Sequence, residues 1–167
     1  PTRRSSDLLG LQWEWHANYQ DTFGFTSDLG YIRIYGHILS KDFVNFWEVP
    51  NLLLQKFPAE EFTVTAKLKV SAKADGQQSG LIVMGWDYGY LGVVKEGDKF
   101  ILNQVVCKDA EQWSPETVTR LAELPVSRRF GAGLYPNYER DIYLQVKVTG
   151  GGICYFNYSL DGRKYTS

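Results

Sequence analysis

The chain has 167 residues, of which 44% are hydrophobic, 22% charged and 15% aromatic, and its formal net charge is -1. This is ordinary globular usage, so it excludes a disordered chain, and the balanced charge excludes the basic surface that binds nucleic acid or anionic lipid. No run approaches the roughly 20 apolar residues that span a bilayer. The aromatic content exceeds what a core needs, so some rings are expected on the surface.

Period-two alternation dominates the chain after a flexible polar lead-in over residues 1–8. In the first predicted strand, Trp13 and Trp15 share one face and are expected to lie in the core. The clearest strand is residues 62–71, "FTVTAKLKVS", in which apolar residues fill the even positions and polar residues the odd ones. Such alternation indicates one buried and one solvated face. The other candidate strands are residues 31–36, 51–57, 99–107, 117–124, 142–149 and 152–159.

Residues 80–94, "GLIVMGWDYGYLGVV", differ from these strands. Two apolar runs flank a connection that carries a single charge, Asp87. A strand with one wet face should alternate apolar with polar residues, but here both faces are apolar. The sequence therefore predicts a hairpin that is covered on both sides.

The pattern of about ten short strands with frequent Gly, Asp and Pro turns predicts an all-β fold. The expected architecture is a two-sheet antiparallel β-sandwich of jelly-roll or lectin-like type, as a single domain over residues 9–167. Residues 127–141 are the least strand-like stretch and are predicted to be a long loop. Residues 158–167 read as part of a hairpin, so the fold is expected to be truncated at its C-terminus. In the predicted strand over residues 142–149, the positions expected to face inward are Ile142, Leu144, Val146 and Val148.

The two cysteines, Cys107 and Cys154, lie far apart without a C-x-x-C spacing, each in an apolar strand-like run. Two buried free thiols are the favoured interpretation. A disulfide between neighbouring strands and a redox or metal role remain alternatives.

The search for catalytic chemistry finds no candidate. Glycoside hydrolysis takes two carboxyl groups beside the scissile bond, and the chain has no E-x-D-x-E alternation on a strand. Asp161 and Asp87 read as turn residues. There is no G-x-S-x-G, only two histidines, and no metal-ligand spacing. No catalytic residue, metal site or cofactor is expected, although a structural calcium ion held by backbone carbonyls would leave no sequence trace.

What remains is aromatic surface. Sugars present flat C–H faces ringed by hydroxyl groups, so their binding sites pair Trp or Tyr platforms with polar side chains. Tyr135 and several other rings lie in turn-like contexts, where a tryptophan is more often a plug over the rim of the core than a platform. The candidate glycan-binding residues are Trp47, Asn51, Gln55, Trp86, Asp87, Tyr88, Trp113 and Tyr138.

Five motifs in order carry a resemblance to a known family: "LGLQWEWHAN", "GYIRIYG", "NLLLQKF", "GLIVMGWDYGYLGVVK" and "CYFNYSLDG". From Leu9 onward the chain resembles the C-terminal concanavalin A-like β-sandwich of glycoside hydrolase family 43 β-xylosidases and α-arabinofuranosidases. The resemblance implies a module that packs beside a five-bladed catalytic propeller and helps shape the rim of its active-site pocket. Some members bind xylan, and the catalytic acids belong to the propeller.

Three positions depart from the family pattern. Tyr19 stands where the family has a proline, Phe23 stands for a tryptophan, and Lys56 replaces an arginine. The last change turns a planar bidentate donor into a point charge. Within the family pattern, the second face of the apolar hairpin is expected to form the floor of the concave sheet, shielded by loops or by the propeller.

The sequence thus predicts a non-catalytic accessory domain of a hemicellulose-degrading enzyme. Its expected partners are the catalytic propeller of the same polypeptide and xylan or arabinoxylan oligosaccharides, with no nucleic acid and no membrane. A self-contained lectin-like glycan-binding protein, a free-standing hydrolase of the lectin fold and a protein-interaction sandwich without sugar affinity are the alternatives.

Overall fold

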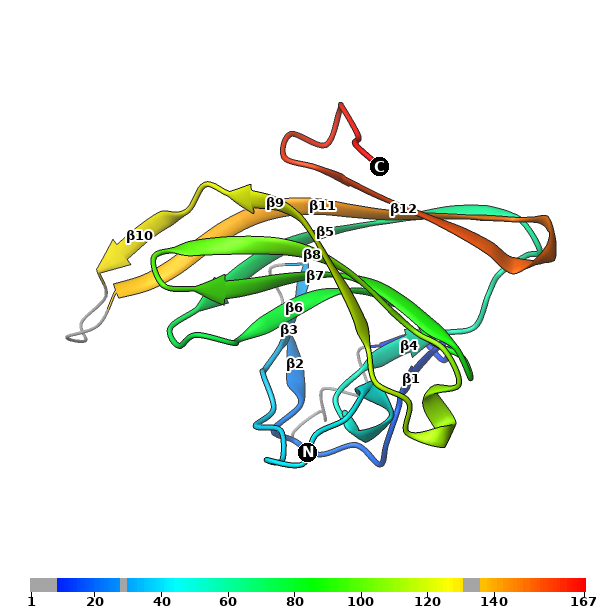
Figure 1. Cartoon of the computed structure of the whole chain (residues 1–167). Helices are drawn as coiled ribbons and strands as arrows, with labels where there is room; N and C mark the ends of the chain where they lie inside the picture. The colour runs from blue at the N-terminus through cyan, green and yellow to red at the C-terminus, as the bar shows by residue number, and fades with distance from the viewer. Residues whose placement is uncertain (1–8, 28–29, 131–135) are drawn as a thin grey trace. The chain divides into compact units, whose positions relative to one another are not determined.

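The computed structural model describes residues 9–27, 30–130 and 136–167 (Figure 1). It divides into two units, Pro1–Phe57 and Pro58–Ser167, which are described separately. Within the described ranges all helical segments are short 3-10 turns, and none is long and apolar enough to cross a membrane. The single domain over residues 9–167 stays a prediction.

The first unit contains two small antiparallel ladders. β1 (Trp13–Trp15) pairs with β4 (Leu53–Gln55), and β2 (Gly24–Ser27) pairs with β3 (Tyr31–Ile34). A 3-10 turn, η2 (Phe46–Glu48), precedes β4, and the buried Asn45 caps it by accepting a hydrogen bond from the Trp47 N–H at 3.0 Å. These ladders are short, so side-chain packing supplies much of the order in this unit.

The prediction that Trp13 and Trp15 both lie in the core is wrong for Trp13. The Trp15 ring packs 5.4 Å from that of Phe23 and 5.8 Å from that of Tyr19, whereas Trp13 is 39% exposed. Trp13 lies at the end of the ladder, opposite Gln55. The two tryptophans share a face, but the aromatic cluster is built around Trp15.

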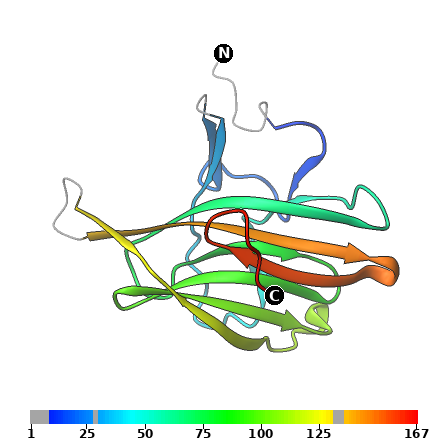
Figure 2. The same ribbon diagram turned by 90° about the horizontal axis from the view of Figure 1, so that it is seen from above.

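The second unit consists of two antiparallel sheets stacked as layers (Figures 1 and 2). In the first sheet the long β11 pairs with β5 along one edge and with β10 and β12 along the other. In the second sheet, β6 to β9 follow one another as a meander. The strand bounds are β5 (Phe62–Ala72), β6 (Gln78–Val83), β7 (Tyr88–Glu96), β8 (Lys99–Cys107), β9 (Thr117–Leu124), β10 (Ser127–Phe130), β11 (Pro136–Thr149) and β12 (Ile153–Ser159). This confirms the predicted all-β, two-sheet antiparallel fold.

The core lies between the two layers. Its buried members are Val70, Ala72, Leu91, Val93, Phe100, Leu102, Leu124, Ile142 and Leu144. The four inward positions predicted on β11 are all buried. On β5 the alternation holds at Val70, but Val64 near the other end of the strand is exposed. Burial of the matched apolar faces is the main driving force for stacking the sheets.

Both faces of β7 are buried, as its sequence predicts. Leu91 and Val93 belong to the core, while Tyr88 and Tyr90 lie on the opposite face and are each 3% exposed. This second face carries polar atoms, and it leads to the candidate site.

The prediction of a long loop over residues 127–141 is wrong. β10 pairs with the start of β11, so the described part of this stretch is a hairpin, and only residues 131–135 lie outside the description. Polar contacts support it: Arg128 binds Asp98 at 2.9 Å, and the Asn137 amide donates to the Ser71 hydroxyl at 2.8 Å. Such contacts, which tie β10 to the turn between β7 and β8 and β11 to β5, give no apolar alternation that the sequence could reveal.

Candidate glycan-binding site

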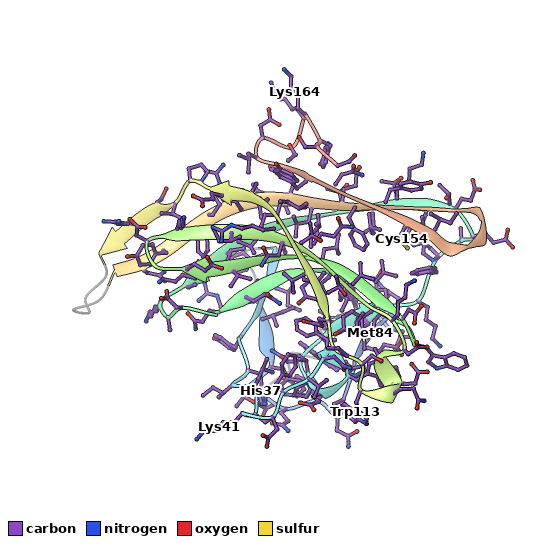
Figure 3. All side chains as sticks on the ribbon, in the orientation of Figure 1. His37, Lys41, Met84, Trp113, Cys154 and Lys164 are labelled. Carbon is purple, nitrogen blue, oxygen red and sulfur yellow. The ribbon has the colours of Figure 1, made fainter. Side chains whose placement is uncertain are left out.

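Two connections meet at one end of the β6–β9 sheet. Residues 84–87 join β6 to β7, and residues 108–116 join β8 to β9. Because β7 and β8 are antiparallel and their ladder ends at the pair Tyr88 and Cys107, these two connections must leave the sheet at the same end. Figure 3 labels Met84 and Trp113 at this end. We call the two connections the tryptophan rim.

Backbone hydrogen bonds hold the rim together through Ala110, which is fully buried in the short 3-10 turn η3 (Ala110–Gln112). The Ala110 N–H donates to the Trp86 carbonyl at 2.9 Å, and its carbonyl accepts from the Trp113 N–H at 3.0 Å. The Asp87 carboxylate accepts from the Asp109 N–H at 2.8 Å. Three residues that the sequence predicts as candidate ligand contacts, Trp86, Asp87 and Trp113, are therefore brought together.

Both rim tryptophans are displayed on the surface. Trp86 is 77% exposed and Trp113 is 55% exposed. Trp113 also has a positive φ of 60°, and Asp109 at the start of η3 has a φ of 51°. A left-handed backbone costs an L-residue with a bulky side chain about 1–2 kcal/mol. An exposed indole on a strained turn contributes little packing in return, so core stability does not explain it.

A chain of hydrogen bonds lies on the second face of the sheet next to the rim. The Tyr88 hydroxyl donates to the Glu116 carboxylate at 2.5 Å and the Tyr90 hydroxyl donates to its other oxygen at 3.3 Å. The Gln78 amide donates to the Tyr90 hydroxyl at 3.0 Å. The Tyr88 and Tyr90 rings stack with centroids 6.2 Å apart. This chain anchors the end of the 108–116 connection to β7 and β6.

Burial sets the electrostatics of this chain. It raises the pKa of the Glu116 carboxyl, although the hydroxyl groups of Tyr88 and Tyr90 lower that pKa in part. Burial and the nearby Glu116 charge raise the pKa of the Tyr90 phenol. Burial also raises the pKa of the Cys107 thiol, which donates to the Ser114 carbonyl at 3.3 Å and is therefore not activated as a nucleophile.

The two cysteines are free thiols, as favoured from the sequence, although only Cys107 is buried and Cys154 is partly exposed. Among the described residues, no group of three or more His, Cys, Asp or Glu side chains is arranged to hold a metal ion. Asp161 is the predicted turn residue: its carboxylate accepts from the Arg163 and Lys164 N–H groups at 2.8 and 3.0 Å.

Two other candidate residues of the second unit, Tyr88 and Tyr138, are not displayed at the surface of the rim. Tyr88 is buried and supports Glu116, so its ring is not open to a ligand. Tyr138 packs against the core, and the Lys95 ammonium lies 4.5 Å from its ring centroid. Tyr135 lies outside the described residues.

The remaining three candidates belong to the first unit. The half-buried Trp47 packs edge-on against His16, whose Nε2 donates to the Trp47 carbonyl at 3.3 Å. The Asn51 amide donates to the Tyr35 carbonyl at 2.6 Å, and Gln55 is exposed at the end of β4. Trp47 and Asn51 thus make structural contacts within this unit.

Sequence reasoning missed Glu116, Tyr90 and Gln78. They are dispersed along the chain, and strand pairing brings them together: Tyr90 is opposite Val105 and Thr117 is opposite Val106. The polar letters within otherwise apolar strands were the available signal, but the register that joins them cannot be read from one sequence.

Comparison with known proteins identifies the family. Residues 5–167 match the model of the β-xylosidase C-terminal concanavalin A-like domain. No curated protein and no solved structure matches the chain. The match spans almost the whole sequence and confirms the resemblance carried by the five motifs. The chain therefore belongs to the family of β-xylosidase C-terminal concanavalin A-like domains.

Proposed function

We propose that the chain is a non-catalytic accessory module of a β-xylosidase-type glycoside hydrolase, which packs on the catalytic propeller of the same polypeptide and binds xylan-type glycans at the tryptophan rim. Family membership supports the accessory role. The observation that carries the glycan-binding half is the pair of exposed indoles, Trp86 and Trp113, joined through the backbone of Ala110.

The chemistry of the rim suits a sugar. An exposed indole can stack on the C–H face of a pyranose and remove apolar area from water, at about 25 cal/mol per Å². Asp87 is exposed beside Trp86, and a carboxylate accepts hydrogen bonds from sugar hydroxyls. Backbone hydrogen bonds already fix both connections, so little loop entropy is lost on binding.

Titration calorimetry of the chain with xylohexaose and arabinoxylan oligosaccharides tests this half. Trp86→Ala and Trp113→Ala are each expected to weaken binding about tenfold or more, because each removes a stacking platform. Trp13→Ala is the matched control, since it removes a partly exposed tryptophan of the first unit. Absence of heat with every xylan-type glycan contradicts the glycan-binding half and leaves the packing half standing.

Exposed apolar side chains in the first unit support the packing half. Ile38 is 93% exposed, and within the same short stretch the exposed large residues also include Tyr31, Ile34, Tyr35 and Leu39. Exposed apolar side chains concentrated in one segment are typical of an interface with another domain or protein.

In the polypeptide that carries the propeller, Ile38→Glu is expected to lower the melting temperature of the catalytic domain, because it places a charge in a dry interface. Ile153→Glu is the control, since it changes an exposed isoleucine of the second unit in the same way. If the two variants behave alike while glycan still binds, the packing half is wrong and a self-contained lectin-like protein is favoured.

A further inference from the structure

The tryptophan rim carries an excess of negative charge. Its acidic side chains are Asp87, Asp109, Glu111 and Glu116, and its single basic side chain is Lys108. These give the two connections a net charge of -3, whereas the whole chain has a net charge of only -1. The rest of the chain is therefore slightly positive, and the negative field is a local property of the rim.

No ion pair among the described residues neutralises these acids. The recorded pairs involve other side chains, such as Lys99 with Glu123 and Arg128 with Asp98. One oxygen of Glu111 is buried without a hydrogen-bond partner in the described part of the chain. Charges without an opposite partner act over a longer range than paired charges do, because no opposite charge cancels their field. The effect is stronger at a partly buried surface, where the effective dielectric constant is lower than in water.

The acidic residues are near neighbours of both exposed tryptophans along the chain. Asp87 directly follows Trp86, and its carboxylate accepts from the Asp109 N–H, so the Asp87 carboxylate and the Asp109 backbone lie at the junction of the two connections. Glu111 lies between Asp109 and Trp113 within η3. Since Asp87 is one residue from Trp86 and Glu111 is two residues from Trp113, a glycan stacked on either indole should meet this negative field, which decays over a screening length of about 8–10 Å at physiological salt.

From this charge pattern we infer that the rim selects uncharged xylan-type glycans and rejects those that carry uronic acid side groups. The inference rests on the proposed function, since it concerns the ligand of the same site. Sugar hydroxyls donate hydrogen bonds to carboxylates, so a neutral glycan gains from the acids. A uronate brings a negative charge into the same field. The repulsion from the four acids outweighs the attraction to Lys108.

The test compares two xylo-oligosaccharides of equal backbone length, one neutral and one bearing a single glucuronic acid side group, by titration calorimetry. At about 20 mM salt the neutral glycan is expected to bind about tenfold more tightly. At about 300 mM salt the ratio is expected to fall to about twofold, because screening shortens the range of the repulsion.

Charge-removing variants localise the effect. Asp109→Asn is expected to reduce the low-salt ratio to about fivefold, and the double variant Asp109→Asn with Glu111→Gln to about twofold, because removing a carboxylate relieves the repulsion of the uronate more than it weakens binding of the neutral glycan. Asparagine tolerates the left-handed backbone at position 109, so folding should not change. Asp98→Asn is the control, since Asp98 lies in the turn between β7 and β8 and pairs with Arg128; it should leave the ratio at about tenfold.

Each result has a distinct meaning. Equal low-salt affinity of the wild-type chain for both glycans overturns the charge selection and leaves the proposed function intact. Failure of the neutral glycan to bind overturns the proposed glycan site itself, and the selection with it. A ratio that Asp98→Asn lowers as much as Asp109→Asn does would show that the effect belongs to total charge and would overturn its assignment to the rim.

Discussion

The two ends of the β6–β9 sheet are built in opposite ways. At the end near the turn between β7 and β8, Lys95 is 4% exposed. Its ammonium binds Asp75 at 2.6 Å and the Gly97 carbonyl at 2.7 Å, and it lies 4.5 Å from the centroid of the Tyr138 ring. At the other end, the rim displays Trp86 and Trp113 on the surface. One end covers its polar and aromatic groups, and the other exposes them.

This difference separates stability from recognition. A buried ammonium is stable only when oxygen atoms and aromatic ring faces compensate its charge. Lys95 finds these partners in Asp75 and Gly97 of two hairpin turns and in Tyr138 of β11, and we call this group the clasp. The rim instead holds both indoles in water, and one of them, Trp113, has a left-handed backbone that no gain in packing offsets. Substitutions at the clasp should therefore cost stability, whereas substitutions at the rim should cost binding.

The largest stability effect is expected at the clasp. Lys95→Ala removes the buried ammonium and its stem and should lower the free energy of unfolding by about 2–3 kcal/mol. Lys67→Ala is the matched control, because the Lys67 ammonium lies 5.6 Å from the Tyr143 ring but the residue is exposed, and it should cost about 0.5 kcal/mol. Urea unfolding of both variants measures the difference. Equal losses would contradict the claim that the clasp stabilises the fold more than an exposed lysine beside an aromatic ring does.

A smaller loss is expected beside the rim. Tyr88→Phe removes the hydroxyl that donates to Glu116 and leaves a half-buried carboxylate with fewer donors, so the free energy of unfolding should fall by about 1–2 kcal/mol. Tyr143→Phe on β11 serves as the control for loss of a phenol hydroxyl. A Tyr88→Phe variant as stable as the control would argue that the chain of hydrogen bonds does not anchor the rim.

A pH-dependent effect follows from Glu116. Burial raises the pKa of its carboxyl in the folded state above the unfolded value, so the folded chain holds this proton more tightly. The resulting penalty is absent at low pH and develops as the pH rises through the unfolded and then the folded pKa. The stability of the wild-type chain relative to Glu116→Gln should therefore fall as the pH rises above about 4. Urea unfolding of both proteins at each pH measures this slope, and a rise would contradict the assignment.

The sequence predicts the buried faces of the two sheets better than it predicts the segments at the ends of the strands. Alternation on β5 and β11 predicts their inward faces, because those strands cross the core where the pattern is imposed by burial. The hairpin of β10 and β11 escapes prediction because polar contacts tie its strands to neighbouring elements, such as Arg128 of β10 with Asp98 in the turn between β7 and β8. Trp13 is misassigned because a shared face does not reveal how far the core extends.

The site shows the same limit. Trp86, Asp87 and Trp113 are recognisable as turn residues, but their junction through Ala110 depends on the pairing of β7 with β8. The position of Glu116 depends in addition on the irregular register of β9, which shifts between Leu102 and Asn103 of β8. The register of paired strands is set by packing and pairing across the whole sheet, so it cannot be read from the local sequence of either strand.

Trp113→Gly tests most directly whether the rim is a platform for a ligand and not a plug for the core. Glycine adopts the left-handed backbone at no steric cost, so the free energy of unfolding should stay constant or rise by up to about 1 kcal/mol. Binding of xylohexaose, measured by calorimetry on the same protein, should weaken about tenfold or more. A loss of stability greater than about 1 kcal/mol with binding unchanged would instead make Trp113 a structural plug and would contradict the account.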